Sequence, residues 1–410
     1  NIGLALADEA LGLRQQELGP EHPDVAASLV MTARLESEVG NYERSEDFLQ
    51  QALALNEAKY GKESHQVAAV LKTLGAIHEE TARYDEALAI YDRALAIAET
   101  IDGPESLDVA DLANNLGVVY WRRDDYAIAE DQYRRALAIR EKQLDSHHPS
   151  VAQTLNNLGD LLRDTERLEE AAKIYQRALE IREQVLGLDH PQLGISLNSL
   201  GNLHNALGNW STAEQLFQQA REIWQQALGP EHDWVAYTLH NLGFNYYAQG
   251  RDREAEAMQR QALRINRAAL GEDNPRTGTS LVMLGQVLRA QGRLEEAAQA
   301  LDAARVTFDR PNSSWELAAC LTERGLVALE QGDPETAEQF LEEVRSMGEA
   351  GLVAEGRLGD ALLGLAKLEQ FRGRPQQAKE LARQAIPLLA TDFAPSHRHL
   401  VEAEQLASGG

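Results

Sequence analysis

Apolar residues recur along the chain at the spacing of one face of a helix. Over residues 151–162 they follow an i, i+4, i+7, i+11 pattern, which predicts an amphipathic helix. Residues 166–167 interrupt this pattern, and a second apolar stripe follows over 168–181. Gly187 is expected to end the second helix in the αL conformation, and Pro191 suits the first turn of the next helix. The pattern therefore predicts two antiparallel helices of about 15 and 19 residues.

This pattern of two helices returns at a fixed period of 42 residues. A short junction phrase, LGPEHPDVA at 18–26, introduces each new period. A fixed period of this length is typical of stacked units, because one unit cannot bury its own apolar face. We therefore predict an all-α solenoid, a superhelix of about nine helix-turn-helix pairs. The junction phrase recurs at 60–68, 103–110, 144–152, 186–194, 228–236 and 270–278.

Small residues occupy fixed positions in each period. Glycine inside a helix costs about 1 kcal/mol relative to alanine, so a recurring glycine in the first helix indicates a steric requirement. We expect a side chain there to push the two helices of a pair apart. Alanines in the second helix are expected to serve close packing within the pair and with the next repeat. The glycines are Gly75, Gly117, Gly159, Gly201, Gly243 and Gly285, and the two alanine series begin at Ala87 and Ala52.

Large and small residues follow one order in each period, carried in one repeat by Leu155, Leu158, Gly159, Leu162, Ala171, Tyr175 and Ala178. This order resembles the tetratricopeptide repeat (TPR). The 42-residue length, the LGxxHP junction and LNNLG at 155–159 resemble the kinesin light chain type. The resemblance covers roughly residues 1–308 and implies a TPR superhelix that binds proteins. Such repeats also occur in bacterial multidomain signalling proteins, fused to kinases, nucleotide-binding switch domains or caspase-like proteases.

The two ends of the chain depart from the regular period. Residues 1–20 are interpreted as the second helix of an interrupted leading repeat, and 21–308 as the regular array. After Ala304 the register fails, and RPNSSW at 310–315 replaces the junction phrase. We interpret 309–390 as two degenerate TPR-like repeats and 391–410 as a closing helix, near 396–407, with a short tail. The first residue is Asn1, so we expect a processed chain or a fragment.

Composition narrows the range of partners. Lys and Arg number 39 against 65 Asp and Glu, a net charge of −26. This excess argues against nucleic acid and anionic membrane surfaces, which attract clustered basic residues. No run of 18 apolar residues and no signal peptide is visible, so we expect a soluble, cytoplasmic protein without a membrane segment. A single cysteine excludes an intrachain disulfide framework and a cysteine-based zinc cluster.

No pattern in the sequence predicts catalysis, a cofactor or a metal. Phosphate-binding loops of the GxxxxGK[ST] type, HExxH and GxSxG are all lacking. Cys320 lies among apolar residues and is expected to be buried. The junction histidines recur too far apart to share a zinc ion, so we expect them to cap helices or stabilise turns. They are His22, His65, His148, His190 and His232.

The resemblance implies that first helices line the concave side of the superhelix, so their non-core face is the candidate binding surface. An asparagine amide both donates and accepts, which suits an extended peptide backbone, and aromatic rings would supply pockets. Alternatively, the asparagines only solvate this face or cap buried groups between repeats. The predicted groove comprises Asn114, Trp121, Asn156, Asp160, Arg163, Asn198, Asn202, Asn205, Tyr237, His240, Phe244 and Tyr247, with a second column of Asn115, Asn157 and Asn241.

Three functions remain open at this point. The first is a non-enzymatic scaffold that binds a protein or peptide. We expect the bound segment to be basic or mixed in charge and to carry an apolar anchor. The second is a sensor or regulatory array of a larger signalling protein, and the third is self-association. Chaperone-binding TPRs use a Lys and Asn clamp for carboxylates. Lys72 and Asn115 match that clamp, but Ala76 and Gln153 depart from it, so a chaperone-tail receptor is not expected.

Overall fold

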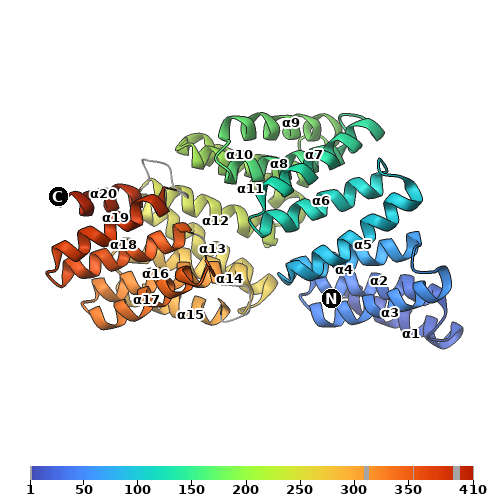
Figure 1. Ribbon diagram of the computed structural model, residues 1–410, viewed down its shortest axis with the longest axis horizontal. Coiled ribbons are helices and arrows are strands. Elements are labelled where there is room, and N and C mark those ends of the chain that lie inside the picture. Colours follow the sequence, from blue (N-terminus) through green and yellow to red (C-terminus); the bar gives the residue numbers. More distant parts are fainter. Residues whose placement is uncertain (1, 309–313, 354, 391–397, 410) are drawn as a thin grey trace. The chain divides into compact units, whose positions relative to one another are not determined.

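The computed structural model describes residues 2–308, 314–353, 355–390 and 398–409, and these ranges form twenty α-helices without a strand. Within the described residues, consecutive helices pack in pairs, from α2 with α3 to α8 with α9 and from α12 with α13 to α18 with α19 (Figure 1). The predicted all-α helix-pair solenoid is therefore confirmed. The chain divides into two compact units, Asn1–Leu203 (unit 1) and His204–Gly410 (unit 2).

The bounds of the helices follow the 42-residue period closely. The first helices of the pairs are α2 (Pro23–Glu38), α4 (His65–Glu80), α6 (Leu107–Arg122), α8 (Pro149–Asp164), α10 (Pro191–Ala206), α12 (Asp233–Ala248), α14 (Pro275–Ala290), α16 (Ser314–Glu330) and α18 (Glu355–Phe371). The second helices are α3 (Tyr42–Tyr60), α5 (Tyr84–Asp102), α7 (Tyr126–Gln143), α9 (Leu168–Leu186), α11 (Trp210–Leu228), α13 (Asp252–Leu270), α15 (Leu294–Phe308), α17 (Pro334–Glu349) and α19 (Pro375–Leu389). The terminal helices are α1 (Ile2–Leu18) and α20 (Arg398–Ser408).

Some sequence predictions fall partly outside the described residues. The segment 310–315 is expected to replace the junction phrase, and residues 310–313 of this segment lie outside the described residues. The closing helix was expected near 396–407, and the described helix α20 begins at Arg398. Residues 396–397 of that prediction, like Gly410, are not described.

The junction between repeats combines a glycine with a capping histidine. Gly187 ends α9 with φ 81° and ψ 169°. The expected αL conformation is therefore wrong in ψ, although the positive φ still favours glycine. Pro191 is the first residue of α10, as predicted. His148 precedes α8, and its Nδ1 accepts a hydrogen bond from the Ser150 backbone N–H at 3.2 Å. His22, His190 and His232 accept in the same way from residues two positions further on.

Glycine permits the close approach of the two helices in a pair. A Cβ atom added to Gly159 would lie 2.6 Å from Cε1 of Tyr175 on the facing helix, closer than real Cβ atoms come to a ring. Gly75 and Gly117 are overlain in the same way by Tyr91 and Tyr133. The predicted steric requirement is thus met by an aromatic ring in three successive repeats. In unit 2 the overlying residue changes to Gln259 or Leu301.

The first helices form the inner layer of each unit. In unit 1, Cα atoms come within 8 Å of one another between α2 and α4, between α4 and α6, and between α6 and α8, and in unit 2 the same holds along the series α12, α14, α16 and α18. Among the described residues, consecutive second helices do not come this close. Because the first helices lie closer together, each unit curves toward them, and we refer to them as the inner layer.

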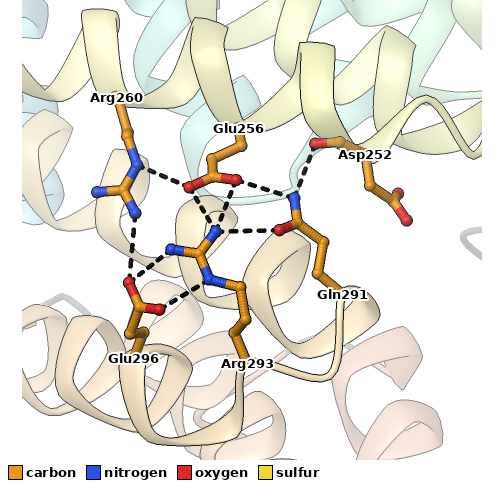
Figure 2. Close-up of polar contacts among 6 residues, drawn as sticks. All are labelled: Asp252, Glu256, Arg260, Gln291, Arg293 and Glu296. Carbon is orange, nitrogen blue, oxygen red and sulfur yellow. Dashed lines mark hydrogen bonds and ion pairs between the residues drawn. The ribbon is translucent and has the colours of Figure 1, made fainter.

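Second helices are bridged instead by long charged side chains. Figure 2 shows Arg293, in the turn before α15, reaching both carboxylate oxygens of Glu256 on α13 at 2.8 Å. Arg260 and Glu296 extend this network, with Arg260 Nε 2.8 Å from Glu256. Unit 1 contains the same four-residue network three repeats earlier, built from Glu130, Arg134, Arg167 and Glu170.

The ion pair from a turn arginine to the preceding second helix recurs along the chain. Arg167 contacts Glu130 at 2.7 Å, and Arg293 contacts Glu256 as described. Further pairs of the same kind join Arg83 to Glu46 and Arg251 to Glu214. Each pair links neighbouring repeats on the side away from the inner layer.

Candidate functional site

The first predicted column lies inside the inner layer rather than on its open face. Asn114, Asn156 and Asn198 each have only 3% of their surface exposed. The expectation of a solvent-facing column is therefore corrected for these three side chains. The physical reason is the close approach of consecutive first helices, which encloses one side-chain position per repeat.

Asn156 belongs to a buried polar network between repeats. Its amide nitrogen donates to Ser199 Oγ at 2.9 Å, and its Oδ1 accepts from Ser196 Oγ at 3.0 Å. The guanidinium of Arg182, which is 3% exposed, also donates to Oδ1 at 2.5 Å. Burial lowers the pKa of Arg182 to about 10. Asn156 thus stabilises a buried cation, and both lone pairs of its Oδ1 are already used within the fold.

The second column is more accessible but also joins repeats. Asn157 is half-buried, and its amide nitrogen donates to Asn114 Oδ1 at 3.2 Å. Asn115 and Asn241 are half-buried as well. Asn157 therefore links α8 to α6, which matches the alternative that these residues satisfy groups between repeats.

The charged positions of the groove prediction come together on α8. The Tyr175 hydroxyl donates to Asp160 Oδ1 at 2.6 Å, and Arg163 Nη1 donates to the same oxygen at 3.2 Å. Burial raises the pKa of Asp160. Trp121 on α6 is joined to this cluster, since its indole N–H donates to Asp164 Oδ2 at 3.0 Å. These side chains form a polar patch across α6 and α8.

Glu79 on α4 belongs to the same patch and is absent from the sequence prediction. In the described structure its side chain has one hydrogen bond, which comes from the Tyr91 hydroxyl at a long 3.5 Å. Burial raises the pKa of Glu79 to about 7. Its position in the 42-residue period equals that of Trp121 and Arg163. Extending the predicted groove column one repeat toward the N-terminus would have found it.

In unit 2 the inner layer presents aromatic rings. Tyr237 and Phe244 lie two turns apart on α12 and are 39% and 42% exposed. Trp234 packs edge-on against Tyr237, with ring centroids 6.2 Å apart. Tyr247, one turn beyond Phe244, is half-buried. Of all the predicted groove residues, Tyr237 and Phe244 are the large apolar side chains most open to solvent.

Other predicted residues of this region are engaged within the fold. His240 Nδ1 lies 3.2 Å from Gln259 Oε1, and burial lowers the pKa of His240. Asn205 is 8% exposed and accepts from Asn245 at 2.7 Å. Asn202, on α10, is half-buried. The exposed aromatic side chains of α12 and the polar patch of unit 1 are therefore the parts of the predicted groove that remain candidate binding residues.

Two further groups bear on metal or redox chemistry. His65, Asp102 and Asp108 bring three possible ligand atoms within 4.8 Å of one another, but all are exposed. Lys72 Nζ lies 3.7 Å from Asp108 and already supplies positive charge there. Cys320 is 1% exposed, and its Sγ donates to the Leu301 carbonyl at 3.2 Å. Its predicted burial is confirmed. Separately, none of the described helices is both long and apolar enough to cross a membrane.

Paired helices at a fixed period, with small residues where the helices meet, define a class of helical repeat proteins. The tetratricopeptide repeat family matches residues 2–58, 66–142, 150–223, 196–268 and 253–305, and further matches cover 114–185, 318–343 and 352–384. The chain therefore belongs to the tetratricopeptide repeat family. A comparison with curated protein sequences gives no match.

Solved structures share the architecture. A Rap protein complexed with competence and sporulation factor is 14% identical, with a TM-score of 0.59 over 90% of this chain and 99% of that one. The apo form of RapI is 16% identical, with a TM-score of 0.55 over 69% of this chain and 98% of that one. A putative kinesin light chain from Podosopora anserina with nearly identical TPR-like repeats is 25% identical, with a TM-score of 0.40 over 48% of this chain and 92% of that one. At these identities the likeness concerns the fold alone.

Proposed function

We propose that this chain is a non-enzymatic scaffold that binds a peptide or protein segment along the inner layer of its first helices. The observation that carries the proposal is the exposure of Tyr237 and Phe244 on one face of α12. Large aromatic side chains that stay open to solvent on a curved inner surface are typical anchors of protein interfaces.

The charge of the chain indicates which segments it would attract. With a net charge of −26, long-range electrostatics favour a basic or mixed-charge partner. The aromatic rings of α12 would hold an apolar side chain of that partner. A Rap protein that shares this fold is solved in complex with competence and sporulation factor, which supports a bound partner for this chain.

A selection from random peptides tests the proposal. The 410-residue chain is immobilised and challenged with twelve-residue peptides displayed on phage, and recovered peptides are synthesised and titrated by calorimetry. We expect recovered peptides to carry an apolar anchor, and the double variant Tyr237→Ala/Phe244→Ala to weaken their binding by about tenfold to a hundredfold.

The matched control is Val306→Ala, which removes an apolar side chain that is 70% exposed on the second helix α15. Its affinity should equal that of the parent chain. Equal binding by the parent and the aromatic double variant would contradict the assignment of α12, and recovery of no peptide at all would overturn the proposed function.

A further inference from the structure

We propose that the inner layer of unit 2 holds a site for a side-chain amide, from asparagine or glutamine, of the bound segment, in a small cavity between Gln286 on α14 and Lys367 on α18. This inference rests on the proposed function and specifies one residue of the partner. The cavity belongs to the repeats that follow α12, so one segment would contact both the aromatic rings of α12 and this site.

The cavity lies where the inner-layer helices α14, α16 and α18 meet α20, and it has a volume of about 30 Å³. One water-sized group needs roughly 10–15 Å³, so the cavity has room for two such groups, as in the oxygen and nitrogen of an amide. Its walls are partly apolar and partly polar. The apolar part includes Ala319, Leu326 and Leu363, and the polar part includes Gln286, Arg357 and Lys367.

Charges at the cavity are balanced within the fold. The carboxylates and the basic side chains at its walls all form ion pairs, which join Glu323 to Arg289 at 3.0 Å, Asp360 to Arg357 at 3.2 Å and Glu402 to Lys367 at 2.6 Å. An ionised ligand would therefore bring an uncompensated charge into a partly buried place, which costs free energy. An uncharged polar group matches the cavity better.

Hydrogen-bonding capacity remains on Lys367 and Gln286. In the described part of the chain, the Lys367 ammonium has one hydrogen-bond partner, Glu402 Oε2, so two of its three N–H groups are left. Gln286 donates its amide nitrogen to Glu323 Oε1 at 3.1 Å, and its own amide oxygen is left as an acceptor. The cavity thus offers a donor on α18 and an acceptor on α14.

A side-chain amide matches this pair of groups. Its oxygen can accept a hydrogen bond from Lys367, and its N–H can donate one to the amide oxygen of Gln286. A hydroxyl also donates and accepts, but it does so on a single atom, whereas the cavity has room for two groups. Asparagine and glutamine are therefore the residues of a bound segment that fit the cavity best.

The cavity continues the groove column that contains Phe244. Gln286 follows Phe244 by one period of 42 residues, and Leu326 and Lys367 follow at intervals of 40 and 41, the same intervals that separate the turn glycines of these repeats. Consecutive first helices from α12 to α18 come within 8 Å of one another. A segment that lies along this column would therefore pass from Phe244 to the cavity.

The geometry predicts how far apart the two contacts lie in the segment. Neighbouring helices pack with their axes about 8–10 Å apart, so α16, the middle one of the three inner-layer helices at the cavity, lies roughly 16–20 Å from α12. An extended chain rises about 3.3–3.6 Å per residue. The amide should therefore follow or precede the apolar anchor by about five or six residues, a distance that a twelve-residue peptide spans.

The test uses the full chain and the twelve-residue peptides selected on it. We expect asparagine or glutamine to be enriched about five or six residues from the apolar anchor. Replacing that amide residue by methionine should weaken binding to the parent chain by about tenfold, because Lys367 and Gln286 lose their partner. On Lys367→Met the same replacement in the peptide should cost much less, because the donor is already removed.

The control variant is Lys173→Met, which removes an exposed lysine from the second helix α9 of unit 1. It should respond to the replacement in the peptide as the parent does. A further peptide carries the acid, aspartate or glutamate, in place of the amide and should bind the parent no more tightly than the amide does. Tighter binding of the acid would show a carboxylate site and overturn the amide assignment.

Two other outcomes would overturn this inference and leave the proposed function intact. One is a set of selected peptides without an enriched amide at the expected distance, and the other is an unchanged affinity of the parent chain when the amide is replaced by methionine. An equal loss on the parent and on Lys367→Met would overturn the assignment to this cavity. If no peptide is recovered, the proposed function fails and the inference fails with it.

Discussion

Glu79 in unit 1 and Glu256 in unit 2 are the same residue type in opposite electrostatic situations. Glu79 lies on the inner layer, and burial without an ion pair raises its pKa to about 7. Glu256 lies between second helices. Burial alone would raise its pKa, but hydrogen bonds from Arg260, Arg293 and Gln291 outweigh this effect and lower the pKa to about 2. One carboxylate is satisfied by the fold, and the other is not.

The difference separates charges that hold repeats together from charges that remain available. Glu256 is engaged by two guanidinium groups and an amide, so the fold itself uses its charge (Figure 2). Within the described part of the chain, the Glu79 side chain has a single, long hydrogen bond. A residue that costs stability and still occupies a buried position is typical of a functional surface.

The largest expected effect is on the stability of the chain carrying Glu79→Gln. The pKa of Glu79 is raised from 4.5 in the unfolded chain to about 7 in the fold, so its contribution to stability is present below pH 4.5 and is lost as the pH rises to 7. At pH 8 the variant should therefore be more stable than the parent, by up to about 3 kcal/mol. Urea titrations at pH 4 and pH 8 measure this. A variant that is less stable at pH 8 would show that Glu79 has a partner in the fold.

Asn156→Ala should show that the buried part of the inner layer is structural. The substitution leaves the guanidinium of Arg182 and the hydroxyl of Ser199 short of a partner. Loss of a bond to a buried charge costs about 2 kcal/mol, so the melting temperature should fall by several degrees. Calorimetric unfolding measures the change, with Asn157→Ala as the more exposed neighbour for comparison. An unchanged melting temperature would return Asn156 to the list of candidate ligand contacts.

Glu256→Gln should lower stability at neutral pH, because it weakens the network between α13 and α15. The side chains of Arg260 and Arg293 are partly exposed, so the expected loss is only about 1 kcal/mol and shrinks in high salt. The depressed pKa means that the contribution is present above pH 4.5 and is lost as the pH falls toward 2. Glu130→Gln, in the equivalent network of unit 1, should behave alike in urea titrations. Opposite signs for the two would show that the networks are not equivalent.

The smallest expected effect on stability is that of Tyr133→Phe, because the hydroxyl it removes has no hydrogen-bond partner among the described residues. We expect a change within about 0.5 kcal/mol, whereas Tyr175→Phe removes a 2.6 Å bond to Asp160 and should cost about 1–2 kcal/mol. Both variants leave the ring over its glycine in place. Denaturant titrations of the pair measure the difference. Equal losses would indicate that the Tyr133 hydroxyl is hydrogen-bonded in solution.

The helix pairs can be predicted from the 42-residue period, whereas the burial of the asparagines cannot. Apolar spacing, Gly187 and Pro191 predict α8, α9 and the start of α10 because these signals are local. Glycine at 159 predicts a close helix pair, because a side chain there has no room. Burial of Asn156, by contrast, depends on how closely α8 and α10 approach across the repeat boundary. A period of 42 residues gives the number of repeats and does not give that distance.

The polar patch of unit 1 was equally hard to assemble from one repeat at a time. Asp160 and Arg163 were recognised because they share a face of one helix. Glu79 and Tyr133 become significant only when residues from three successive repeats are brought together. The negative charges that act on the Tyr133 hydroxyl come from side chains of other repeats.

The recurring arginine–glutamate pair affects how the number of repeats in such an array can change during evolution. Between residues 46 and 251 the pair joins every second junction, through Glu46 and Arg83, Glu130 and Arg167, and Glu214 and Arg251. Loss of the single repeat 60–101 would bring Asp125 opposite Glu46, so two carboxylates would face each other. Loss of the two repeats 60–143 would instead bring Arg167 opposite Glu46 and restore a pair of opposite charges. Duplications and deletions within a gene that encodes this array should therefore be tolerated more readily when they add or remove two repeats than when they add or remove one.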